Sequence, residues 1–122
     1  MYIIDIDPKP YVRPRVNTIT RSAYNTKDYK DYKTTLTWLI AQKKIPKSIY
    51  GELQISFYLK RPKSKSKVLQ NHQVKPDLDN LIKAFMDALE NSGVIENDSN
   101  FHSIIAMKRY GEVPKIEFEL KE

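Results

Sequence analysis

Residues 75–83 read KPDLDNLIK, and this stretch predicts the start of a helix around which the rest of the sequence can be arranged. Lys75 precedes a proline and is therefore biased towards extended backbone, so the helix is expected to begin at about Asp77. Gly93 is a natural C-terminal stop, which gives a helix over about 77–91. Apolar residues recur at helical spacing along one face of it: Leu78, Leu81, Ile82, Phe85 and Leu89.

The sequence on either side of this helix predicts an α+β (mixed α/β) fold. Residues 52–60 alternate apolar and polar side chains, which is typical of a half-buried strand. A second helix is expected over about 27–43, with Asn25 or Thr26 as its cap. The other expected strands are 2–6, 101–110, 115–121 and a short one beginning at Val94-Ile95. We therefore expect residues 1–122 to form a single domain, a mixed sheet with two main helices packed against it.

The predicted helix start gathers acids and a lysine. Asp77 can cap the helix, whose N-terminus stabilises negative charge. Asp79 lies in the first turn, and Lys83, four residues on, projects from the same face. Two carboxylates make a poor site for a divalent cation, because Mg²⁺ prefers about six oxygen ligands. Asp98 can supply a third if the chain doubles back after the helix, with Glu96 as a less favoured substitute, so Asp77, Asp79 and Asp98 are candidate ligands of a metal ion.

Composition favours a nucleic-acid partner and excludes several classes of site. The net charge is +6 and the pI is about 9.4, a balance suited to polyanions. The absence of cysteine excludes a disulfide framework and any cysteine-ligated zinc or iron–sulfur site. No apolar run approaches the ~20 residues of a membrane span. The start MYIIDID carries acids where a signal peptide carries basic residues, so we expect a soluble cytoplasmic protein.

A basic segment directly precedes the acidic helix, and a metal-dependent nuclease needs both basic and acidic side chains. Residues 60–75 hold six basic side chains and no acid, whereas 77–98 hold six acids against Lys83. Cations would hold the DNA backbone and carboxylates would hold the divalent ion. The predicted DNA contacts are Arg13, Arg15, Lys60, Arg61, Lys63, Lys65, Lys67 and Lys75. Neither His72 nor His102 is assigned a role.

Each of these features also has a simpler interpretation. Asp77 can be only a helix cap, and Asp79 with Lys83 only an exposed ion pair of the i,i+4 type. The lysine-rich segment can be merely solvated. Asp5 and Asp7 repeat the spacing of the two helical acids, but they lack the following lysine and the third acid, so we expect them to be surface residues.

The quoted stretch resembles the signature of the RusA family of Holliday junction resolvases, crossover junction endodeoxyribonucleases common in phages and prophages. That signature reads Lys-Pro-Asp-x-Asp-Asn-Leu-x-Lys, then Asp-Ala-Leu, then an acidic pair after a short turn. Here the first part is intact at 75–83, followed by Asp87-Ala88-Leu89 and by Asn97-Asp98, which retains the second acid of the pair. The segment Arg13-Pro14-Arg15 and Lys108 are also similar to the family's pattern.

The resemblance implies a specific activity. Members are homodimers that bind four-way DNA junctions without needing their sequence and nick two opposed strands, leaving 5′-phosphate and 3′-hydroxyl ends. Asp77, Asp79 and Asp98 would be catalytic and would hold Mg²⁺ or Mn²⁺, and Lys83 would be the essential basic residue. The implied setting is DNA recombination and repair, or phage DNA processing, in the bacterial cytoplasm.

Three other functions are compatible with the same residues. One is a DNA-binding module without catalysis, which would bind junctions indifferently to magnesium. Another is a different structure-selective metal nuclease, which would prefer flaps or single strands. The third is an assembly protein that binds no nucleic acid and would show no salt-dependent DNA binding.

Overall fold

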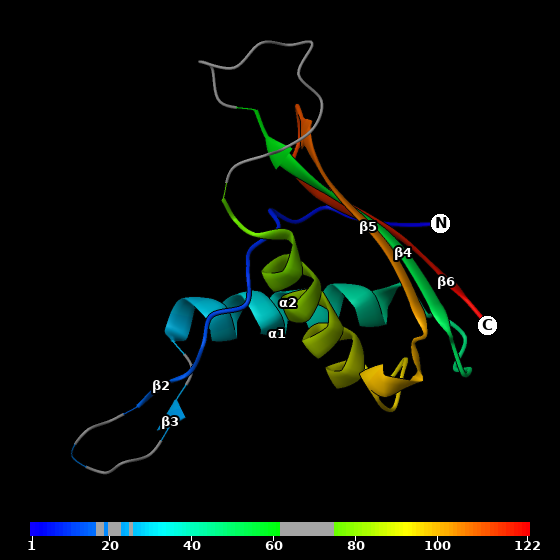
Figure 1. Cartoon of the computed structure of the whole chain (residues 1–122), viewed down its shortest axis with the longest axis horizontal. Coiled ribbons are helices and arrows are strands. Elements are labelled where there is room, and N and C mark those ends of the chain that lie inside the picture. Colours follow the sequence, from blue (N-terminus) through cyan, green and yellow to red (C-terminus); the bar gives the residue numbers. More distant parts are fainter. Residues whose placement is uncertain (17–18, 20–22, 25, 62–74) are drawn as a thin grey trace.

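Two helices pack on one face of a four-stranded mixed sheet in the described part of the chain (Figure 1). The computed structural model describes residues 1–16, 19, 23–24, 26–61 and 75–122. The helices are α1 (Lys27–Gln42) and α2 (Leu78–Asn91). The strands of the sheet are β1 (Tyr2–Ile4), β4 (Glu52–Lys60), β5 (Ser103–Gly111) and β6 (Lys115–Lys121). The structure thereby confirms the predicted α+β architecture.

The order of the strands, β1-β6-β4-β5, makes α2 a crossover connection. Strands β4 and β5 are parallel, with Leu53 opposite Ile104, whereas β6 is antiparallel to both β1 and β4. Parallel neighbours cannot be joined by a tight turn, so the chain leaves β4, forms α2 and returns through a short 3₁₀ helix, η1 (Asp98–Asn100), into β5. The acids of α2 and Asp98 therefore belong to one crossover.

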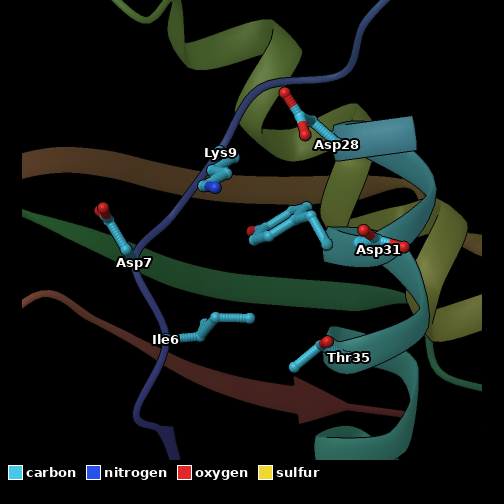
Figure 2. A pocket seen from close by; sticks show the side chains of 7 residues that line it. Ile6, Asp7, Lys9, Asp28, Asp31 and Thr35 are labelled. Carbon is cyan, nitrogen blue, oxygen red and sulfur yellow. The ribbon is translucent and has the colours of Figure 1, made fainter. Parts of the chain in front are cut away.

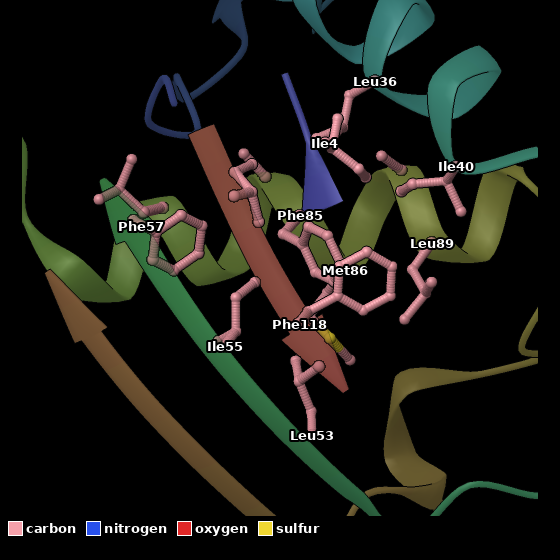
Figure 3. Close-up of a cluster of buried hydrophobic side chains, with 14 of the residues drawn as sticks. Ile4, Leu36, Ile40, Leu53, Ile55, Phe57, Phe85, Met86, Leu89 and Phe118 are labelled. Carbon is pink, nitrogen blue, oxygen red and sulfur yellow. The ribbon is translucent and has the colours of Figure 1, made fainter. Parts of the chain in front are cut away.

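The core lies between the sheet and the two helices, and it determines which face of α2 meets solvent. Alternate residues of β4 are buried against the helices, as are four residues of α1 and six of α2. Figure 3 shows Phe85 of α2 beside Phe118 of β6, with ring centroids 4.9 Å apart in an edge-to-face arrangement. Because this stripe is buried, the stripe that carries Asp79 and Lys83 faces outward.

The predicted elements agree with the structure where local periodicity is strong. The strand expected at 52–60 is β4, the strand expected at 115–121 is β6, and both helices lie within one residue of their expected ends. Thr26 is the cap of α1, since its Oγ1 accepts a hydrogen bond from the N–H of Tyr29 at 3.4 Å. Neither helix of the described residues has both the length and the apolar character needed to span a membrane.

Four predictions about strands were wrong. The first strand ends at Ile4 rather than 6, because Ile4 pairs with Ile116 near the start of β6 and the pairing runs out there. Val94 and Ile95 form no strand; their side chains are buried in the turn after α2. The strand expected at 101–110 runs from 103 to 111, because Phe101 caps η1. Residues 7–25, where Pro8, Pro10 and Pro14 predict irregular structure, contain a short antiparallel pair, β2 (Arg15–Val16) with β3 (Ala23–Tyr24).

Candidate active site

The start of α2 places the two acids of the Asp-x-Asp motif differently. Asp77 occupies the N-cap position with extended backbone, but its side chain makes no capping hydrogen bond. Its carbonyl oxygen accepts the first helical bond, from the N–H of Leu81 at 3.2 Å. Asp79 lies in the first turn, where its Oδ1 accepts from the N–H of Asn80 at 3.0 Å. The carboxylate of Asp77 thus lacks the capping hydrogen bond that a purely structural role as helix cap would require.

A cavity of about 280 Å³ joins the outward face of α2 to the turn that follows it. Three acids and one lysine line it, together with apolar side chains; the full lining is Asp79, Ile82, Lys83, Met86, Asp87, Asp98, Phe101 and Ile104. We call it the site pocket. The crossover therefore brings Asp98 to the same pocket as Asp79 and Lys83. The sequence predicts that Asp98 lies near both Asp77 and Asp79, but Asp77 is not among the lining residues.

The site pocket brings together two of the three carboxylates that the sequence predicts as metal ligands. Within the described residues, no three His, Cys, Asp or Glu side chains lie close enough to hold a metal ion, so the structure does not bring the three predicted carboxylates into one cluster. Metal binding by these residues stays a prediction. Magnesium is commonly held by one or two carboxylates, with waters and substrate phosphates completing its coordination. Asp79 and Asp98 offer two such hard oxygen donors from two different elements at one pocket.

The turn that carries Asp98 is fixed by two hydrogen bonds. The N–H of Asp98 donates to Oε1 of Glu90 on α2 at 2.9 Å, and the N–H of Ser99 donates to Oδ1 of Asn97 at 2.9 Å. Asn97, which stands where the RusA signature often has an acid, is therefore the cap of η1. Sequence reasoning did not find the role of Glu90, because nothing in its spacing indicates which backbone group it reaches.

The ammonium group of Lys83 contacts an aromatic ring instead of an acid. Its Nζ lies 4.7 Å from the centroid of the Tyr11 ring, within the range of a cation–π interaction. The ion pairs formed within the described residues are Lys115–Glu117 and Lys121–Glu52, so Lys83 and Asp79 do not form the i,i+4 pair of the simpler interpretation. The two opposite charges stay separate in the same pocket.

Two tyrosines support Lys83, one in contact with it and the other packed against the first. The sequence did not single them out for this site. Tyr11 and Tyr29 meet edge to face, with ring centroids 5.4 Å apart. The hydroxyl of Tyr29 donates to Oδ2 of Asp87 at 2.9 Å, and Asp87 lines the site pocket. Burial first, and then the hydrogen bond to Asp87, raise the pKa of Tyr29 well above its usual range, so its hydroxyl remains a donor.

The predicted DNA-contacting residues lie on several segments. Arg13, Lys60 and Lys75 are exposed. Arg61 is partly exposed, and its guanidinium lies over the Tyr110 ring at 5.2 Å. The remaining predicted residues are Arg15, which belongs to β2, and Lys63, Lys65 and Lys67, which together with His72 lie outside the described residues. DNA contact by these residues stays a prediction.

Lys108 of β5 reaches the segment before α2. Its Nζ donates to the carbonyl oxygen of Pro76 at 2.7 Å, which links β5 to the residue preceding Asp77. The sequence suggested Lys108 by resemblance alone, and the structure gives it this contact.

A second acidic cavity lies elsewhere, between the N-terminal segment and α1 (Figure 2). Its volume is about 360 Å³, and its lining is Ile6, Asp7, Lys9, Asp28, Asp31, Tyr32 and Thr35. We call it the N-terminal pocket. Asp5 and Asp7 are exposed, as expected of surface residues, but Asp7 has two further acids beside it from α1. Burial raises the pKa of Tyr32 to about 12.

Comparison with known proteins points to one family. The family model described as endodeoxyribonuclease RusA matches residues 5–121. The matched range contains both helices and every residue of the site pocket. No curated protein matches the chain.

Proposed function

The chain belongs to the RusA endodeoxyribonuclease family, and from this membership we propose that it is a Mg²⁺-dependent nuclease that resolves four-way (Holliday) DNA junctions by paired symmetric nicks. The observation that carries the proposal is the presence of Asp79, Lys83 and Asp98 around one pocket. A module that only binds DNA gains nothing from carboxylates at its surface, since they repel phosphate.

Asp77, Asp79 and Asp98 would hold the Mg²⁺ (or Mn²⁺), which when bound polarises a phosphate and makes hydroxide available from water near neutral pH. Lys83 stabilises the negative charge that develops on the phosphoryl oxygens. The oxygen of water bonds to phosphorus as the bond to the 3′ oxygen breaks, leaving a 5′-phosphate and a 3′-hydroxyl. Arg13, Arg15, Lys75 and the basic residues from Lys60 to Lys67 bind the DNA backbone.

A homodimer fits this substrate. A four-way junction is close to twofold symmetric, so two identical sites related by a twofold axis would meet two opposed strands. We propose that the protein acts in this form in recombination and repair, or in phage DNA processing, in the cytoplasm.

The test is cleavage of a synthetic mobile junction with Mg²⁺ or Mn²⁺, with cut positions mapped on all four strands. We expect nicks at symmetric positions on opposed strands, and no cleavage with EDTA. Asp79→Asn should bind the junction as wild type does and lose cleavage. Linear duplex and flap substrates serve as controls.

The outcomes separate the competing functions. Full cleavage by Asp79→Asn in magnesium would refute the proposed site. Junction binding by the wild type without any nicking would favour a non-catalytic binding module, and equal cleavage of flaps would favour a different structure-selective nuclease. Absence of salt-dependent DNA binding would exclude a nucleic-acid function altogether.

A further inference from the structure

The N-terminal segment is attached to α2 at the level of the site pocket. The backbone N–H of Tyr11 donates to the carbonyl oxygen of Asn80 at 2.8 Å, one residue beyond Asp79. The Tyr11 side chain is partly buried and packs against the core, and its ring lies beside Nζ of Lys83. In Figure 1 the blue N-terminal segment runs past the start of α2 on its way to β2. The ring is therefore held to the helix by its own backbone.

A second ring supports the first. Tyr29, buried on α1, meets Tyr11 edge to face, and its hydroxyl bonds to Asp87, one turn beyond Lys83 on α2. The N-terminal segment, α1 and α2 are thereby joined through two rings that we call the aromatic brace, Tyr11 and Tyr29. Its geometry does not depend on the exposed Lys83 side chain, because the backbone bond of Tyr11 and the hydroxyl bond of Tyr29 fix both rings.

The ammonium group of a lysine at this position has two possible environments other than an aromatic ring. Its flexible four-carbon stem would allow the ammonium to pair with Asp79, four residues earlier on the same face, or to point into water. In the structure the Lys83 side chain is exposed, but its ammonium group forms no ion pair with Asp79 and lies over the Tyr11 ring. An ion pair with Asp79 would neutralise one of the carboxylates that we propose as metal ligands and would withdraw the cation from the phosphate.

We propose that Tyr11 is a positioning residue of this nuclease: its ring holds the Lys83 ammonium in the site pocket and apart from Asp79, so that both charges remain available to metal and phosphate. The inference rests on the proposed function in so far as Lys83 acts in cleavage. Tyr11 itself contacts no reacting atom.

The decisive comparison is between Tyr11→Leu, which removes the ring, and Tyr11→Phe, which keeps it. Tyr58→Leu is the matched control, because it removes a ring that lies under another lysine, Lys115 at 5.0 Å, on the sheet face that points away from the helices. Each variant keeps its backbone bonds and an apolar side chain, and thermal unfolding checks that it is folded.

Tyr11→Leu should lower kcat for junction cleavage about three- to tenfold and raise the Mg²⁺ concentration for half-maximal rate, with the junction Kd unchanged. Tyr11→Phe should restore both values, and Tyr58→Leu should leave them unchanged. If Tyr11→Leu bound the junction more weakly but kept its kcat, Tyr11 would serve only to place Arg13 and Arg15 against DNA. That result would overturn the inference. A loss in Tyr11→Phe equal to that in Tyr11→Leu would overturn it as well.

A measurement without DNA separates this inference from the proposed function. The NMR signals of the Lys83 ε-methylene should be shifted by the ring current in wild type and Tyr11→Phe, and should lose that shift in Tyr11→Leu, which should also bind Mn²⁺ more weakly. If the wild type never nicks a junction, the proposed function fails. The NMR and Mn²⁺ measurements would still show whether the Tyr11 ring positions Lys83. Lys83 signals and Mn²⁺ affinity that are unchanged in Tyr11→Leu would refute the positioning role whatever the activity.

Discussion

The site pocket and the N-terminal pocket hold the same charges and differ in how the structure fixes them. Each is lined by three aspartates and one lysine: Asp79, Asp87, Asp98 and Lys83 in the first, and Asp7, Asp28, Asp31 and Lys9 in the second. Each also has a buried tyrosine of α1 beside it, Tyr29 or Tyr32. Charge composition alone therefore does not distinguish a reactive pocket from an ordinary acidic surface.

The difference lies in the bonds around the charges. In the site pocket, Asp87 is held by Tyr29, the backbone of Asp98 by Glu90, and Lys83 by the ring of Tyr11. In the N-terminal pocket, Asp28 lies in the first turn of α1, where an acid is favoured by the helix dipole without any ligand. A site for chemistry is set apart by preorganisation, because charges that must first be ordered stabilise a transition state less.

The largest expected effect comes from changing one aspartate in each pocket. Asp98→Asn should lower the rate of junction cleavage at least about 100-fold, the order of loss expected when one electrostatic group of an active site is removed. Asp31→Asn makes the same chemical change in the N-terminal pocket and should leave the rate unchanged. Single-turnover cleavage assays measure both. If the two variants lost activity equally, the two pockets would not differ in function as we infer.

A smaller effect is expected on stability from the bond that supports Asp87. Tyr29→Phe deletes one hydroxyl that donates to a carboxylate, and should lower the free energy of unfolding by about 1–2 kcal/mol. Tyr58→Phe deletes a longer bond to Glu117, at 3.3 Å on the open face of the sheet, and should cost less. Urea denaturation of the two variants gives the comparison, and equal losses would show that the brace adds no local stability.

The smallest effect concerns the tyrosine of the N-terminal pocket at high pH. Because the pKa of Tyr32 is raised to about 12 in the folded protein, above the usual tyrosine pKa of about 10, the unfolded chain loses this proton first. Its stabilising contribution is complete below about pH 10 and falls as the pH rises towards 12. The loss attributable to Tyr32 between about pH 9 and 10.5 should stay below about 1 kcal/mol. Urea denaturation of wild type and Tyr32→Phe across this range measures it, and identical pH dependence would contradict the prediction.

Sequence periodicity located the elements that position the site. The alternation at 52–60 and the apolar stripe after Asp77 depend on neighbours in the chain, so β4 and α2 could be predicted closely. The same periodicity placed Asp79 and Lys83 on one face. Strand ends were harder to predict, because β1 ends opposite the start of its antiparallel partner β6, and that depends on pairing between residues far apart in the sequence.

Taken by itself, the sequence determined the class of the protein, the helix that carries the acids, and the need for Asp98 to return to that helix. The tertiary structure alone decided that Lys83 contacts Tyr11 rather than Asp79, that Asp87 is held by Tyr29, and that Glu90 fixes the turn before Asp98. Helical spacing reports which side chains share a face. Which partner an outward-facing charge selects depends on segments brought beside it by packing of the core, and chain spacing carries no information about that choice.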